Sequence, residues 1–224
     1  MTLAVWLGSA APARTVRWLD GALATAAKLD AGAIGLCAGD TGWLDLAADR
    51  ARHAGIASAG VPTELALDYL GWAQVVAAAA RSLGATTVLV DEASRPERAA
   101  EVGALAEQIG AVQLTRVIEL ANDDGGLRAK RLAGGLVQTV RVRGTAVIGV
   151  RIAGEPLDEY PTPVPNKSMR RLELGALGLD PSVLAHRALP KRGGSSPRKT
   201  VERVADYLAM HVQVTGARTA QRGA

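Results

Sequence analysis

Residues 72–90, WAQVVAAAARSLGATTVLV, carry the pattern that decides the fold. Apolar side chains recur there at the spacing of one helix face, at Trp72, Val75, Val76, Ala79 and Leu83. Gly84 follows as a helix stop, and residues 86–90 are predicted as a buried strand. A helix that leads at once into a strand is typical of an α/β fold.

The same alternation extends to both sides of this stretch. Strands are predicted at residues 3–7 and 33–37, and helices at residues 16–27, 42–53 and 102–109. Beyond Gly110 four strands are predicted, at residues 112–120, 127–132, 136–142 and 145–152, and their short connections call for antiparallel neighbours. We therefore expect a three-layer α/β/α domain with a mixed, mainly parallel sheet.

Changes in composition divide the chain into three predicted segments. Residues 1–153 form the α/β, nucleotide-binding-like domain. Residues 154–189 are expected to form an extended arm, because four prolines fall between residues 154 and 166. Residues 190–224 begin as a Gly/Ser-rich linker and continue into a helix and tail. The apolar face of that C-terminal helix needs a surface to cover it, in this chain or in a partner.

Composition excludes several classes of protein. Apolar residues make up 48% of the 224 residues and charged residues 21%, which permits a packed core. Aromatic residues are only 3%, which counts against binding single strands by base stacking, and the basic C-terminal residues are expected to face solvent or a partner rather than nucleic acid. One cysteine and three dispersed histidines predict no disulfide and no metal site. We expect no membrane span and a cytoplasmic location.

Two loops follow strands where ligands bind in parallel sheets, at residues 37–41 and 91–97. Neither G-x-G-x-x-G nor G-x-x-x-x-G-K-[ST] occurs in the chain. In the first loop, Cys37, Ala38 and Gly39 are the candidate cofactor-binding residues, since glycine lets a backbone approach a ligand. The favoured reading is simpler: a βα turn with Asp40 or Thr41 as helix cap, and Cys37 buried and inert.

In the second loop the candidate residues are Asp91, Ser94 and Arg95. Ser94 stands three residues before Glu97, the spacing of a capping box, so the following helix would satisfy its own first amides. Asp91 and its neighbour Glu92 would repel a phosphate, and Arg95 is the one residue of the loop whose charge would attract it. This pattern predicts an empty or altered nucleotide site. We identify no catalytic nucleophile and expect no enzyme.

Several segments also occur in a recognisable order. They are IGLCAGD at 34–40, the helix and strand at 69–91, RAKRLAGGL at 128–136, TAVIGV at 145–150, GEP at 154–156, VPNKSM at 164–169 and LGLD at 177–180. Taken together, they resemble the beta subunit of electron transfer flavoproteins over most of the chain. The resemblance implies a divergent member with an adenine nucleotide alpha hydrolase-like fold.

The resemblance further implies a heterodimer with an alpha subunit that holds most of one FAD. Such a pair carries electrons from a flavin-dependent dehydrogenase to a downstream acceptor. The segment with Val164, Pro165, Asn166 and Met169 would dock on the dehydrogenase, with Val164 as the apolar anchor. A structural wrap around the partner subunit is the alternative role for this arm.

Departures from the family pattern bear on the second nucleotide. The family binds AMP through a QTGQ-type loop, where this sequence has RAAE at residues 98–101. The glycine that would free backbone amides for a phosphate is absent, which counts against AMP binding. Two other functions remain open: a nucleotide-binding or sensor module on the same scaffold, and a purely structural partner subunit without a redox role.

Overall fold

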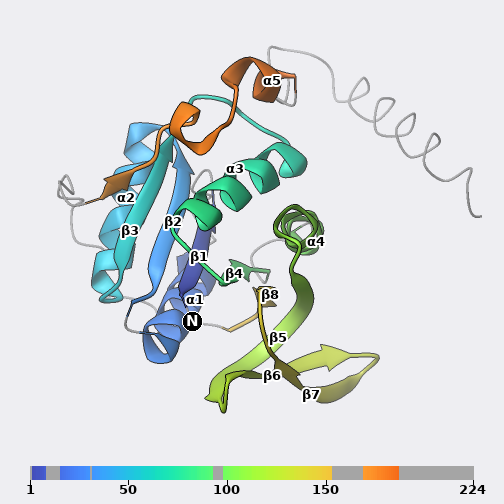
Figure 1. Ribbon diagram of the computed structural model, residues 1–224. Coiled ribbons are helices and arrows are strands. Elements are labelled where there is room, and N and C mark those ends of the chain that lie inside the picture. Colours follow the sequence, from blue (N-terminus) through green and yellow to red (C-terminus); the bar gives the residue numbers. More distant parts are fainter. Residues whose placement is uncertain (1, 9–15, 31, 93–97, 153–168, 187–224) are drawn as a thin grey trace, which may run out of the picture. The chain divides into compact units, whose positions relative to one another are not determined.

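The computed structural model describes residues 2–8, 16–30, 32–92, 98–152 and 169–186 (Figure 1). Its strands are β1 Leu3–Gly8, β2 Ile34–Gly39, β3 Ala57–Pro62, β4 Thr87–Asp91, β5 Val112–Asp123, β6 Gly126–Ala133, β7 Leu136–Val142, β8 Ala146–Val150 and β9 Arg170–Arg171. Its helices are α1 Val16–Leu29, α2 Thr41–His53, α3 Tyr69–Ser82, α4 Arg98–Ile109 and α5 Pro181–Ala185, with a 3₁₀ turn, η1, at Gly175–Leu177.

The strands form one sheet in the order β7-β6-β5-β8-β4-β1-β2-β3-β9. Only two of its pairings, β5–β6 and β6–β7, are antiparallel in the described part of the chain. Helices α1 and α2 pack on one face and α3 and α4 on the other. The predicted three-layer α/β/α fold with a mixed, mainly parallel sheet is therefore confirmed.

Alternation along the strands builds the two cores. In β4, Leu89 joins the core under α1 and α2, whereas Val88 and Val90 join the core under α3 and α4. All three side chains are at most 1% exposed. Because successive strand residues point to opposite faces, one short strand anchors both helical layers.

Two predictions of strand arrangement were incomplete or wrong. β3 was not predicted, because its sequence ASAGVP lacks the large β-branched run that marks a strand. β8 was expected beside β7 and antiparallel to it, but it lies between β4 and β5 and is parallel to both. The register of β5 shifts between Leu114 and Val117, where Arg116 has φ 58°, so the strand bends. β7 ends at Val142 and β8 begins at Ala146, so three residues connect them.

The described part of the predicted arm, residues 169–186, packs against the α/β domain. β9 pairs with the edge of β3, and Leu172 N–H donates to Gly60 O at 2.9 Å. Leu172 and Leu184 are 7% and 2% exposed.

The predicted linker and C-terminal helix at residues 190–224 lie outside the described residues. Among the described helices, none has the length and apolar character to cross a membrane.

Candidate functional site

Strand order reverses beside β1, and this reversal marks the candidate site. The chain runs outward from β1 to β2 and β3, then crosses to β4 on the other side of β1. In such sheets the crevice for a ligand lies at the carboxyl ends of the two strands that flank the reversal. Here those ends are Gly8 and Asp91, and most of the predicted loop after Asp91 lies outside the described residues. The other predicted loop follows β2, one strand away.

The loop after β2 is built as an ordinary helix start. The Asp40 carboxylate accepts the Trp43 N–H at 2.8 Å and caps α2, which confirms the simpler reading of this turn. Gly39, at φ 144°, lets its carbonyl oxygen accept the Thr63 N–H at 3.0 Å. The Trp43 amide at this helix start is therefore satisfied by the helix's own cap and is not available to a ligand.

Side chains of the two residues before that turn are buried in opposite cores. Cys37 is fully buried, with Sγ 3.5 Å from Ala59 O, and burial raises the pKa of its thiol to about 12. Ala38 is fully buried in the core under α3 and α4. The prediction that Cys37 is buried is confirmed, and its side chain has no route to a cofactor. A role for this loop through its backbone stays a prediction.

The end of β4 places two acidic side chains in the interior. Asp91 and Glu92 are each 1% exposed. Glu92 Oε2 accepts the Arg116 N–H at 2.6 Å, and Glu92 Oε1 lies 3.4 Å from the guanidinium of Arg151. Gly149 makes room for this carboxylate, because a Cβ there would overlap Glu92 Oε2. Ser94 and Arg95 lie outside the described residues.

Glu92 therefore holds the bend of β5. Arg116 has a left-handed backbone, which costs free energy for a residue with a Cβ. Its N–H is turned out of the strand ladder toward Glu92, and Arg151 N–H donates to Val117 O just beyond the bend. The charged acceptor offsets the strain of the bend. Sequence reasoning missed this role, because the partners lie 24 and 59 residues from Glu92.

Indole rings flank the end of β1 on both faces of the sheet. Trp6 packs with its ring centroid 6.1 Å from that of Trp72 on the α3 side. On the other side Trp43 Nε1–H donates to Gly8 O at 2.8 Å. The recess beside Trp6, Trp72 and Tyr69 holds about 10 Å³, so it has room for about one water molecule and not for a cofactor ring.

A larger groove lies at the opposite edge of the sheet. Its volume is about 570 Å³, and it is lined by the end of α1, the β5–β6 turn and the residues that precede β4 and β8. Asn122 Nδ2–H donates across it to Leu29 O at 3.1 Å, and Asp123 pairs with Arg141 at 2.8 Å. This groove was not predicted, and it is distinct from the crevice at the carboxyl ends.

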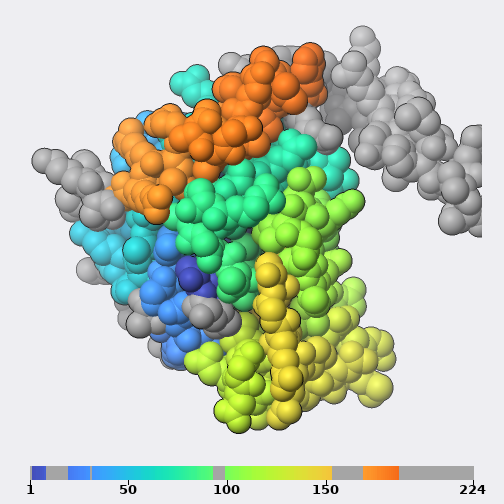
Figure 2. All heavy atoms as spheres, in the orientation of Figure 1, coloured from blue at the N-terminus to red at the C-terminus, as the bar shows by residue number. Residues whose placement is uncertain are grey.

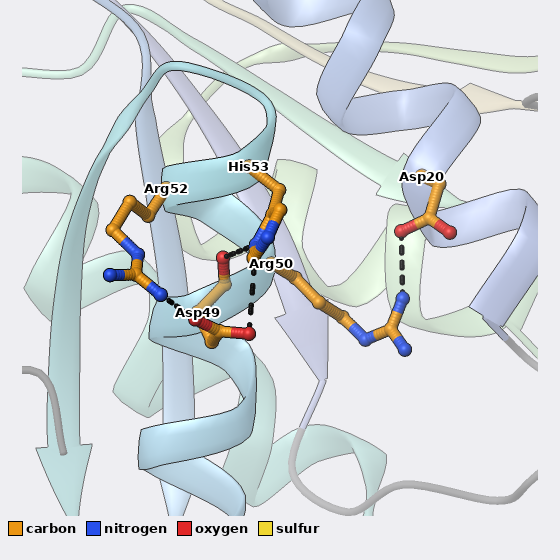
Figure 3. Close-up of polar contacts among 5 residues, drawn as sticks. All are labelled: Asp20, Asp49, Arg50, Arg52 and His53. Carbon is orange, nitrogen blue, oxygen red and sulfur yellow. Dashed lines mark hydrogen bonds and ion pairs between the residues drawn. The ribbon is translucent and has the colours of Figure 1, made fainter. Parts of the chain in front are cut away.

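A buried ion pair joins the two helices of one layer. Figure 3 shows Asp20 of α1 and Arg50 of α2 pointing toward each other, 2.9 Å apart. Their side chains are 11% and 5% exposed. Burial raises the pKa of Asp20 against the lowering effect of Arg50 and His53. Asp49 contacts Arg52 and His53 within α2, so in this cluster it is the Asp20–Arg50 pair that joins α1 to α2.

Met169, predicted as a docking residue, is half-buried against its own domain. A Cβ on Gly60 would overlap the Met169 sulfur, which shows how closely the side chain covers β3. Val164, Pro165 and Asn166 lie outside the described residues, so the docking role stays a prediction.

Within the described ranges no three His, Cys, Asp or Glu side chains gather into a possible metal site. No protein-family model matches the chain, and no curated protein matches it significantly.

Proposed function

We propose that the chain is a divergent beta-type subunit of an electron transfer flavoprotein. It pairs with an alpha subunit to hold FAD, and the pair shuttles electrons from a flavin-dependent dehydrogenase to a downstream acceptor. The ordered sequence segments and the doubly wound sheet support this proposal. A cytoplasmic location is part of it.

The observation that carries the proposal is the pair of carboxylates buried at the end of β4. Pyrophosphate needs free backbone amides or cationic side chains. The described residues at the end of β4 offer two buried carboxylates instead, Asp91 and Glu92, and the guanidinium of Arg151 already lies beside Glu92. These residues do not fit the phosphates of a dinucleotide, so a partner would have to hold most of the cofactor. The same two carboxylates count against AMP binding.

In this proposal the flavin supplies the one-electron chemistry and the chain supplies an environment for it. Trp6, Trp43 and Glu92 are buried at the ends of β1 and β4, and Trp43 Nε1–H donates to Gly8 O. A buried, low-dielectric environment strengthens any electrostatic influence on a nearby redox group. The chain itself performs no bond-making step, so it is an electron-carrier subunit rather than an enzyme.

Co-expression with a candidate alpha subunit of the same genome tests the proposal. We expect a yellow complex with one chain of each kind per FAD. Denaturation should release the FAD, and the dehydrogenase should reduce the FAD in the intact complex. The alpha subunit expressed alone is the control for flavin retention. A colourless, stable monomer that binds no candidate alpha subunit would overturn the proposal. Tight AMP or ATP binding by the isolated chain would instead favour the sensor module.

A further inference from the structure

The aromatic side chains that the structure describes gather at one place, around the carboxyl end of β1. Trp6 lies in β1, and Trp43 Nε1–H donates to Gly8 O at the end of that strand. The ring centroid of Trp72 is 6.1 Å from that of Trp6, and Tyr69 lines the same small recess as both of them. The chain has 4 tryptophans, 3 tyrosines and no phenylalanine, so all of its aromatic residues are of types that can be oxidised.

Trp6, Trp72 and Tyr69 form a series that leads from the interior to the surface, named here the aromatic row. Trp6 is 3% exposed, Trp72 is half-buried and Tyr69 is 42% exposed. Tyr69 and Trp72 are three residues apart on α3, so their side chains lie on the same side of that helix. The rings of Trp6 and Trp72 are tilted by 41° at a centroid distance typical of rings in contact. The row therefore connects the buried end of β1 with solvent.

The recess along the aromatic row does not accept a ligand ring. Its volume of about 10 Å³ leaves room for about one water molecule. Figure 2 shows α3 in teal-green and α4 in yellow-green lying side by side on this face, and Glu101 of α4 lines the recess together with the rings. The rings therefore contact one another rather than a cofactor, and the exposed Tyr69 ring fills no core.

Burial and charge set a direction along the aromatic row for an electron hole, which is a ring that has lost one electron. A positive charge on a buried ring is costly, because the interior solvates it poorly. A hole formed at Trp6 is therefore driven outward to Trp72 and then to Tyr69. The Glu101 carboxylate at the recess favours positive charge on the neighbouring rings. At Tyr69 the phenolic proton can leave to water, so the hole ends there as a neutral tyrosyl radical.

We infer that the aromatic row is a path that carries electron holes from the end of β1 to solvent. The oxidant is by class a free radical strong enough to oxidise indole, and it takes one electron from Trp6. Trp72 returns an electron to Trp6, and Tyr69 returns one to Trp72 while its phenolic proton passes to water. A soluble hydrogen-atom donor such as ascorbate then restores Tyr69.

This path is separate from the proposed electron shuttling. Electrons that move between flavins lie at potentials too low to oxidise indole, so they do not use the aromatic row. The row would act only on strong oxidants that form near the candidate site, and it would direct the damage to an exposed side chain that can be repaired.

Pulse radiolysis of the full chain tests the inference. Azide radicals each take one electron from a tryptophan side chain and become azide ions. We expect the absorption of tryptophanyl radicals to decay while that of a tyrosyl radical grows at the same rate, independent of protein concentration. Tyr69→Phe should abolish the tyrosyl signal. Tyr160→Phe and Tyr207→Phe replace the other two tyrosines of the chain and are the matched controls, which should leave the signal unchanged.

Two further measurements examine the path itself. Trp72→Phe interrupts the aromatic row and should slow the growth of the tyrosyl signal, although Tyr69 is still present. In the wild-type chain, a nitroso spin trap should form its adduct on the peptide that contains Tyr69, as identified by mass spectrometry.

Several results would overturn the inference. They are the absence of a tyrosyl radical, its loss in a control variant instead of Tyr69→Phe, an unchanged rate in a folded Trp72→Phe variant, and a spin-trap adduct mainly on tryptophan. None of these measurements needs a partner or a flavin, so the inference can fail while the proposed function stands.

Discussion

Replacing Gly149 with alanine tests the role of Glu92 at the candidate site. The new Cβ would overlap Glu92 Oε2 and lie 3.1 Å from Val102 Cγ2. The carboxylate must then move, although it is 1% exposed and packed under α4. Its hydrogen bond from the Arg116 N–H, 2.6 Å long, would be lost or lengthened. The bend of β5 would lose the acceptor that stabilises it.

The size of the effect follows from these contacts. A hydrogen bond to a charged group contributes about 1.5–3 kcal/mol, and overpacking a tight interior costs about 1–3 kcal/mol. Alanine recovers about 0.5–1 kcal/mol over glycine, because it has less backbone freedom to lose. We therefore expect Gly149→Ala to reduce the free energy of unfolding by about 2–5 kcal/mol.

Urea unfolding followed by tryptophan fluorescence measures this change, since Trp6 and Trp43 are buried. Gly103→Ala is the matched control, because a Cβ in that part of α4 meets only Gln113 at 3.4 Å. The control should be neutral or more stable by about 0.5–1 kcal/mol. The double variant Gly149→Ala/Glu92→Ala should be no less stable than Glu92→Ala alone. Additive losses, or a single variant within about 0.5 kcal/mol of wild type, would refute the reasoning.

Three further predictions follow from single contacts. Burial raises the folded-state pKa of Asp20 above 3.8, so the free energy of unfolding should fall as pH rises from 3.8 through that raised pKa. Asp20→Asn should remove this part of the pH dependence. Equal slopes of unfolding free energy against pH for both proteins, measured in urea, would contradict this. Cys37 should react with a thiol reagent only at the rate of unfolding, because it is fully buried and its pKa is about 12; rapid labelling of the native chain in a colorimetric thiol assay would count against it. Gly126→Ala should reduce the free energy of unfolding by about 1–3 kcal/mol, since its Cβ would overlap the Val142 carbonyl oxygen across the hairpin. A neutral result in urea unfolding would disprove the close approach.

Local pattern predicted most of the elements correctly. The apolar face from Trp72 to Leu83 became α3, and the strand predicted after it became β4. Asp40 was one of two predicted caps, and it does cap α2. These features depend on neighbours a few residues away, so the sequence contains what is needed to infer them.

Features that depend on distant partners were not predictable in this way. The sequence of β3 has little strand character. It forms a strand because its backbone pairs with β2 on one side and β9 on the other. In the sequence Glu92 belongs to a predicted loop. In the structure it is buried between the bend of β5 and Arg151. The exposed end of the β6–β7 hairpin, with Leu132, Leu136 and Val137, is visible only when solvent exposure and strand register are known together.

Periodicity and composition by themselves determined that this chain is a layered α/β protein whose cores are aliphatic. The tertiary structure decided where β8 inserts, which carboxylates are buried at the crevice, and which apolar side chains stay exposed. The physical reason is the range of the interactions. A helix face or a cap is set within one or two turns of chain, whereas strand order and burial are set by whole surfaces meeting across dozens of residues.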